Sequence, residues 1–199
     1  MPKISAPTVA EHREAQHAAL LQAAEEILLT GGVEAVSPAA VTKQAGLARS
    51  TFYEYFPSKD DLLVALAREA FEQWADELER DVSAVASGPD RLRAYVRTTL
   101  RLTADGRHGL ATTLRGVRLS PKSHDDIAAL HAALDDPLQD LLADLVDDPR
   151  AHAPLVHGLL GAAMAQVTAG ADPVATADRA AHLLLSGFGN RDSDTLSLN

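Results

Sequence analysis

The spacing of apolar residues constrains the fold of this 199-residue chain more than any other feature of its sequence. Leucine and alanine recur at intervals of roughly three and four residues, as on one face of a helix. No segment alternates apolar and polar residues over the length of a β-strand. Glycine and proline interrupt the helical pattern, as at Gly31-Gly32 and Ser87-Gly88-Pro89. The sequence therefore predicts an all-α fold of about nine helices.

Capping residues and helix breakers set the expected limits of these helices. Thr8 and Glu11 have the spacing of a capping box, and Gly46 ends a short second helix that Ser37-Pro38 begins. Pro137 should kink or split the seventh helix. The expected helices occupy residues 8–32, 37–46, 47–56, 58–85, 89–104, 110–119, 125–146, 154–168 and 172–190.

Composition narrows the class of protein. The chain has no cysteine, which excludes disulfides and thiolate chemistry and is typical of a reducing compartment. No apolar run is long enough for a membrane span, so we expect a soluble cytoplasmic protein without a membrane partner. The formal net charge is -10, which argues against nonspecific binding of polyanions. Any contact with DNA must therefore be local.

One segment, residues 37–63, has the pattern of a helix-turn-helix. Gly46 permits the left-handed turn between two short helices, while Val41 and Phe52 are spaced to pack them together. Residues 37–59 carry three basic residues against one acidic residue, a balance of 3 − 1 = +2 within an acidic chain. The face expected to point outward carries short polar and aromatic side chains that suit a DNA groove: Arg49, Ser50, Thr51, Tyr53 and Tyr55.

The stretch from Ala45 to Leu63 resembles the signature of the tetracycline-repressor (TetR) family. Ala45-Gly46 precedes the expected recognition helix, and tyrosine-x-x-phenylalanine-proline-x-lysine follows from Tyr53 to Lys59. With the first helix, the resemblance spans residues 8–63, or 63 − 8 + 1 = 56 residues. It departs from the family pattern at Ser50, Pro38 and Ala39.

The resemblance implies particular DNA contacts. Tyr53, Tyr55 and Lys59 match positions that contact backbone phosphates in the family, and Ser37 and Lys43 match flanking phosphate contacts. The positions of Arg49, Ser50 and Thr51 are those that reach base edges or phosphates. Two alternatives stay open, because Tyr53 could be a packing residue and Lys59 a solvated charge.

The resemblance also implies a domain order and a function. Residues 8–57 would form the DNA-binding domain, residues 58–190 a ligand-sensing and dimerisation domain, and residues 1–7 and 191–199 disordered tails. The expected protein is a homodimeric transcriptional repressor that binds palindromic double-stranded operator DNA. A small, largely apolar ligand of unknown identity would release it.

Helical spacing supplies candidates for the two remaining sites. A mostly apolar ligand pocket with a few polar groups is expected from Trp74, Tyr95, Thr99, Leu102, Leu110, Leu114 and Met164, although each also suits a plain core position. Small residues permit close helix approach, which predicts a dimer interface at Gly158, Ala162, Ala165, Leu184 and Phe188. Packing of the same helices within one chain is the alternative.

The sequence argues against two other classes of function. Glu14 and His17 form one Glu-x-x-His motif, whereas a di-iron bundle needs two, and no hydrolase or phosphate-loop motif is present. We therefore expect no enzyme activity, metal site or cofactor. The second alternative is a helical interaction or ligand-binding protein that has lost DNA binding. The polar recognition face argues against it.

Overall fold

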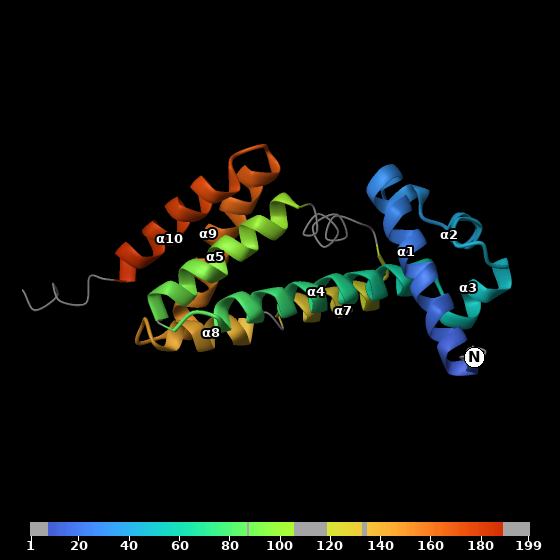
Figure 1. Ribbon diagram of the computed structural model, residues 1–199, viewed down its shortest axis with the longest axis horizontal. Coiled ribbons are helices and arrows are strands. Elements are labelled where there is room, and N and C mark those ends of the chain that lie inside the picture. The colour runs from blue at the N-terminus through green and yellow to red at the C-terminus, as the bar shows by residue number, and fades with distance from the viewer. Residues whose placement is uncertain (1–7, 87, 106–118, 133–134, 189–199) are drawn as a thin grey trace, which may run out of the picture. The chain divides into compact units, whose positions relative to one another are not determined.

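The computed structural model describes residues 8–86, 88–105, 119–132 and 135–188. In these ranges the chain forms helices joined by turns and contains no strand (Figure 1). The all-α prediction is confirmed. The expected helix at residues 110–119 and the expected tails at residues 1–7 and 191–199 lie outside the described ranges, apart from Leu119.

Helix α1, Val9–Ala35, begins at the predicted capping box. The Thr8 hydroxyl accepts a 3.2 Å hydrogen bond from the Glu11 amide, and the Glu11 carboxylate accepts one from the Thr8 amide. Near the other end Gly32 has φ +71°, a conformation that only glycine adopts freely, so the regular helix breaks there. The helix thus starts and breaks where the sequence predicts.

Helices α2, Pro38–Gln44, and α3, Arg49–Tyr55, form the predicted helix-turn-helix. Ser37 caps α2 by accepting a 3.2 Å hydrogen bond from the Ala40 amide. Gly46 follows with φ +68°, and the Leu47 amide bonds back to the Thr42 carbonyl at 2.9 Å. The turn glycine therefore has the left-handed conformation expected of it.

The remaining helices follow the predicted order, with differences in where some of them begin and end. Their bounds are α4 Lys59–Ser83, α5 Gly88–Ala104, α7 Pro121–Ala132, α8 Asp135–Ala143, α9 Pro149–Thr168 and α10 Pro173–Phe188. The helix expected at 125–146 is divided into α7 and α8, in agreement with the expected kink or split, and Pro137 lies in the first turn of α8, where a missing N–H is tolerated. Helix α9 begins at Pro149 rather than Pro154, because Asp148 caps it through the Ala151 amide at 3.1 Å.

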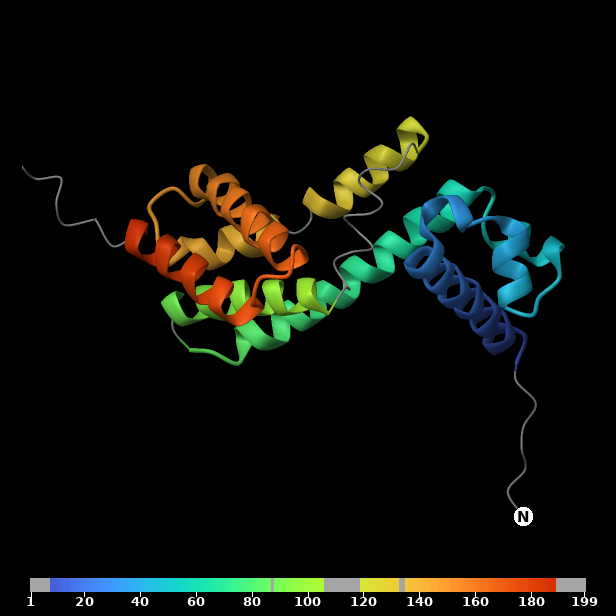
Figure 2. The same cartoon turned by 90° about the horizontal axis from the view of Figure 1, so that it is seen from above.

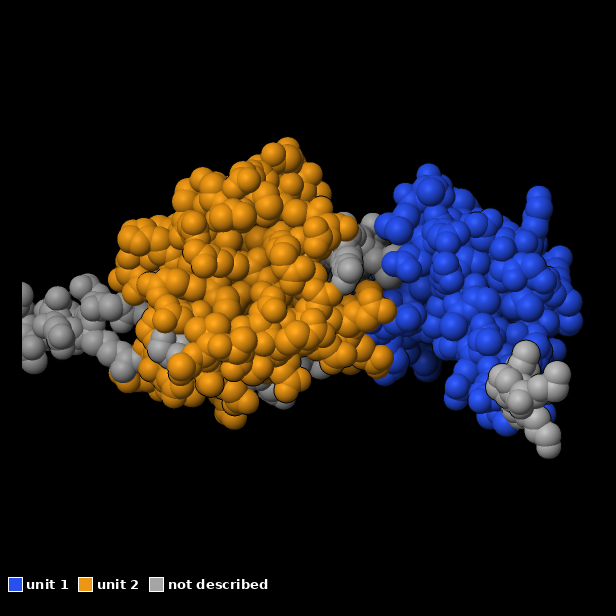
Figure 3. Space-filling view, viewed as in Figure 1, with its two compact units in different colours: residues 1–69, 110–128 blue, residues 70–109, 129–199 orange. Residues whose placement is uncertain are grey.

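The chain divides into two compact units (Figure 3). Unit 1 comprises residues 1–69 and 110–128, and unit 2 comprises residues 70–109 and 129–199, so the first boundary falls inside α4. Unit 1 contains α1, α2 and α3, and its buried side chains include Leu20, Val41, Phe52, Phe56 and Leu63. No described helix is both long and apolar enough to cross a membrane.

Unit 2 packs α5, α8, α9 and α10 around one core. Helix α5 lies beside both α9 and α10 in the two ribbon views (Figures 1 and 2). Leu100 of α5, Leu142 of α8 and Leu160 of α9 are buried in this core. At its surface Arg97 of α5 contacts Asp178 of α10 at 2.8 Å, an exposed ion pair that adds roughly 0–1 kcal/mol.

Candidate DNA interface and sensor residues

Helix α3 is fixed to unit 1 by two phenylalanines. Phe52 and Phe56 are buried, with ring centroids 5.8 Å apart. Their placement turns Arg49, Ser50 and Tyr53 to the surface, and the Tyr53 side chain is 52% exposed. These residues can reach a DNA groove without disturbing the core.

Thr51 does not lie on this exposed face. We expected it to point outward with its neighbours, but it is buried, at 9% exposure. It directly precedes Phe52, and both residues fall on the side of the short helix that packs inward. The outward orientation predicted for Thr51 is therefore wrong.

Tyr55 is held against α1 rather than fully presented to solvent. Its hydroxyl donates a 3.0 Å hydrogen bond to Oε1 of Gln16, and its ring is half-buried. The partners are 39 positions apart, so no local sequence signal points to Gln16. The structure thus adds Gln16 as a residue that positions the end of α3.

Lys59 closes the end of α1. Its Nζ donates a 2.6 Å hydrogen bond to the Val33 carbonyl, next to the break at Gly32. Carbonyls at the C-terminal end of a helix lack helical partners, and a cation there also interacts favourably with the negative end of the helix dipole. One of the three donors of the ammonium group is used in this way.

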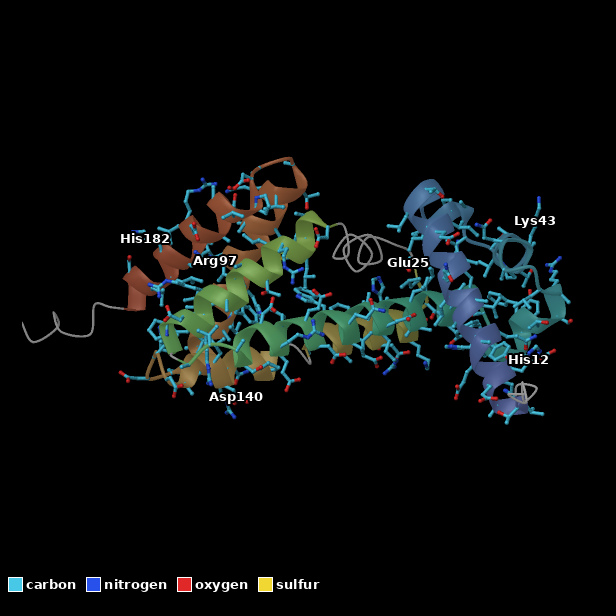
Figure 4. All side chains as sticks on the ribbon, in the orientation of Figure 1. His12, Glu25, Lys43, Arg97, Asp140 and His182 are labelled. Atoms are coloured by element: carbon cyan, nitrogen blue, oxygen red, sulfur yellow. The ribbon has the colours of Figure 1, made fainter. Side chains whose placement is uncertain are left out.

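The two predicted flanking residues lie on either side of α2. Ser37 is half-buried as the cap of the helix, and Lys43 is exposed in its last turn. The Lys43 side chain extends away from the helix (Figure 4). The exposed Lys43 side chain can therefore contact a bound molecule more fully than the half-buried Ser37 can.

The described ligand candidates all belong to unit 2. Tyr95, Thr99 and Leu102 of α5 are buried, and Trp74 of α4 and Met164 of α9 are partly buried. Leu110 and Leu114 lie outside the described residues. Thr99 is only 2% exposed, and its hydroxyl oxygen has no hydrogen-bond partner among the described residues.

A polar cluster joins α4 to α5 within unit 2. The Arg101 guanidinium contacts Glu77 at 3.0 Å and Asp81 at 3.3 Å, and Thr98 donates to Asp81 at 2.6 Å. The hydrogen bond to Glu77, with the charge of both acids, raises the pKa of Arg101. Sequence periodicity does not reveal this cluster, because it depends on how the two helices are paired.

The dimer candidates divide into exposed and buried residues. Gly158, Ala162 and Ala165 of α9 are exposed, and a Cβ placed on Gly158 meets only open space. Leu184 of α10 is 8% exposed and belongs to the core of its own unit, and the Phe188 side chain lies outside the described residues. Two further leucines on these helices are exposed, Leu155 at 70% and Leu183 at 61%.

Known proteins resemble the chain most clearly at its N-terminal end. The family model described as "Bacterial regulatory proteins, tetR family" matches residues 20–66. The fatty acid metabolism regulator protein of Bacillus subtilis is 32% identical over 92 residues, which are 46% of this chain and 47% of that protein. The regulator BetI of Rhizobium meliloti is 28% identical over 101 residues, or 51% of this chain and 47% of that protein. The chain thus spans about half the length of the curated relatives it matches.

Solved structures extend the likeness in fold over most of the chain. The regulator FadR from Bacillus subtilis, solved in complex with stearoyl-CoA, aligns with a TM-score of 0.73 at 24% identity, covering 86% of this chain and 98% of that one. A TetR-family regulator from Streptomyces coelicolor aligns with a TM-score of 0.71 at 22% identity, covering 88% and 94%. Residues 20–66, which include the helix-turn-helix, are thus similar to the tetR family of bacterial regulatory proteins, and the described all-helical fold is that of the solved regulators.

Proposed function

We propose that the protein is a transcriptional repressor that binds a palindromic operator as a dimer and is released by a small molecule. Residues 8–57 would bind DNA, and residues 58–190 would sense the ligand and dimerise. The observation that carries this proposal is the polar outer face of α3, where Arg49, Ser50 and Tyr53 are exposed on a helix anchored by buried aromatic residues. A rigid helix with such a face suits the major groove.

The proposed DNA contacts differ in kind. Arg49 can pair with a guanine edge in bidentate fashion, and Ser50 and Tyr53 lie beside it. Lys43 and Ser37 would meet phosphates at the flank, together with the free donors of Lys59. Thr51 and Tyr55 would act by holding α3 in place, since the first is buried and the second is bonded to Gln16.

A dimer is proposed through α9 and α10. Support comes from Leu155 and Leu183, two large apolar side chains that are mostly exposed, and from the small residues Gly158 and Ala162 between which a partner helix could approach closely. Exposed apolar side chains of this size commonly mark an interface. Two such helices from each protomer would form a four-helix contact around a twofold axis.

Release of DNA would follow from differential affinity. An operator fixes the separation of its two half-sites, so a dimer whose recognition helices are spread apart binds it weakly. A ligand that binds the spread state more tightly shifts the population toward it. Helix α4 is the proposed lever, because it continues from the helix-turn-helix into unit 2, where Thr98 and Arg101 hold it to α5.

The ligand is proposed to be largely apolar, with one hydrogen-bonding group for Thr99. The buried Thr99 hydroxyl supports this, because an unpaired buried hydroxyl costs about 1–3 kcal/mol that a ligand could recover. A thermal-shift screen would start from stearoyl-CoA and shorter acyl-CoAs, since FadR binds the first. Trp74→Ala should abolish both the shift and the release of DNA.

Thr99→Val tests the polar part of the proposed site. Valine has nearly the same shape as threonine and lacks the hydroxyl, which has no partner among the described residues, so the unliganded protein should melt at a higher temperature. The acyl-CoA that raises the melting temperature of the wild-type protein should bind the variant more weakly. A variant that melts higher but binds every hit equally well would remove Thr99 from the site.

Selection of DNA sequences by the purified full chain tests the regulatory function. Duplexes with a random core would be enriched by binding, and the region upstream of the protein's own gene would be tested by gel shift. The expected product is a palindrome with half-sites centred about one helical turn apart. Failure to enrich any duplex over a random library would refute the proposed function.

A further inference from the structure

One face of α1 runs alongside α3 and ends at an arginine. Leu20 on this face is fully buried, and the His17 ring lies 5.2 Å from the Phe56 ring and 5.8 Å from the Tyr55 ring, measured between centroids. Arg13 lies one helical turn before His17, so it continues the same face. The Cζ atom of Arg13 is 5.7 Å from the centre of the Tyr55 ring.

Tyr55 is held at both its hydroxyl group and its ring. Gln16 accepts the hydrogen bond of the hydroxyl, and Arg13 lies over the ring as a cation does in a cation–π contact. A guanidinium placed on a ring face keeps the N–H donors at its edge available for an anion. The contact therefore orients Arg13 without using its hydrogen bonds.

The charge of Arg13 is available to a partner. Arg13 is exposed, and among the described residues it makes no ion pair with an acid. Glu11, two residues before Arg13, accepts the hydrogen bond of the Thr8 amide with its carboxylate in the capping box. Within the described part of the chain, no ion pair with a carboxylate therefore competes with binding of an anion by Arg13.

The geometry points to Arg13 as a further DNA contact that pairs with a backbone phosphate, with Tyr55 as its positioning residue. A recognition helix in the major groove has a sugar–phosphate strand on each side. Ser37 and Lys43 flank α3 on the side of α2, whereas Arg13 flanks it on the side of α1. The first turns of α1 then belong to the interface. This inference rests on the proposed function.

The salt dependence of DNA binding tests the inference. The probe is a fluorescein-labelled duplex with the sequence that the wild-type protein selects. Fluorescence anisotropy gives the affinity at KCl concentrations from about 50 to about 300 mM, a range over which counterion release changes the affinity measurably. Arg13→Gln should lower the slope of log K against log salt by about 0.9 per bound protomer, with about an eight-fold loss of affinity per protomer at 0.1 M salt. Arg13→Lys should keep the slope.

A matched control removes the same charge elsewhere. Arg93, an exposed arginine paired with Asp90 in unit 2, is changed to Gln, and its slope should equal that of the wild-type protein. Tyr55→Leu removes the ring that holds Arg13 and should lower the affinity less than Arg13→Gln does. If Tyr55→Leu fails to fold, as circular dichroism would show, the Gln and Lys variants of Arg13 still decide the question.

The possible results separate the two levels of the argument. An unchanged slope in Arg13→Gln, with selected DNA still bound by the wild-type protein, overturns the role of Arg13 and leaves the proposed function standing. Equal loss in Arg13→Gln and Arg93→Gln also overturns it, because the effect would then be one of overall charge. If the wild-type protein binds no selected duplex, the proposed function and this inference both fail.

Discussion

The hydroxyl of Thr98 on α5 donates a 2.6 Å hydrogen bond to the carboxylate of Asp81 on α4. Thr98 is 4% exposed and the Asp81 side chain is 41% exposed, so the bond is partly buried, and the charge of the carboxylate strengthens it. Arg101 contacts the same carboxylate at 3.3 Å. The C-terminal half of α4 is therefore fixed to α5 by a charged group that both helices share.

Thr98→Val should lower the free energy of unfolding by about 1–2 kcal/mol, since a hydrogen bond to a charged group is lost while the shape is kept. Chemical denaturation measures the change. Thr168→Val is the control, because among the described residues the Thr168 hydroxyl bonds only to the Met164 carbonyl of its own helix. Equal changes in the two variants would show that the bond to Asp81 has no special weight.

Arg49→Ala and Tyr53→Phe should weaken binding of the selected DNA while the melting temperature stays the same. Both side chains are exposed, so they contribute little to the core, and loss of a base contact costs about 1–3 kcal/mol. Gel shift and differential scanning fluorimetry report the two quantities. Unchanged affinity in both variants would contradict the placement of the recognition face.

Lys59→Ala should affect both stability and DNA binding. Loss of the bond to the Val33 carbonyl should lower the free energy of unfolding by about 1 kcal/mol. Loss of a phosphate contact by the remaining donors should lower the salt slope by about 0.9 per protomer. Lys43→Ala, an exposed residue, should change the slope alone. A Lys59→Ala slope equal to wild type would reduce Lys59 to a helix cap.

Gly158→Arg combined with Ala162→Arg should convert the protein from a dimer to a folded monomer. Two large charged side chains on the exposed face of α9 would prevent close approach of a partner helix. Sedimentation velocity gives the mass. Ala128→Arg with Ala129→Arg, an exposed pair on α7, should stay dimeric. A folded Gly158 variant that sediments as a dimer would move the interface elsewhere.

Acid should loosen the start of α1. The Thr8 amide, and then the Thr8 hydroxyl, lower the pKa of Glu11 below its ordinary value of 4.5. The unfolded chain therefore takes up this proton at a higher pH than the folded chain, so the capping box stabilises the helix above pH 4.5 and is lost as the pH falls through the lowered pKa.

The Thr8 amide shift in NMR spectra should report this titration with a midpoint below 4.5. Glu11→Gln keeps an acceptor for the Thr8 amide but cannot ionise, and the same resonance should then be independent of acid. A midpoint of 4.5 or above in the wild-type protein would contradict the lowered pKa.

Local chemistry in the sequence predicts the helix starts and the helix-turn-helix. Thr8 with Glu11 and Ser37 with Pro38 are signals contained within four residues, and each begins a helix in the structure. Gly46 likewise has the positive φ that its place in the turn requires. Such features depend on neighbours along the chain, so sequence is sufficient for them.

Pairings between distant residues could not be predicted in this way. The bond of Tyr55 to Gln16 and that of Lys59 to Val33 depend on how α1 packs against the helices that follow it. The burial of Thr51 has a related cause. Helix α3 has only about two turns, and the side that packs inward includes Thr51 as well as Phe52. Leu184, a candidate for the dimer interface by its spacing, lies in the core of its own chain, which the sequence left open as the alternative.

The division of the chain has a consequence for gene fusions. Unit 1 takes residues 1–69 and 110–128, so the polypeptide passes between the units three times rather than once. The Ser120 amide, for example, bonds to Asp60 in the first turn of α4 at 2.8 Å. A chimera that joins the first 69 residues to the C-terminal part of another protein would lose Ser120 and with it this hydrogen bond. A chimera made with a single crossover therefore separates the two segments of unit 1. Transferring residues 110–128 together with the N-terminal segment keeps the hydrogen bond between Ser120 and Asp60.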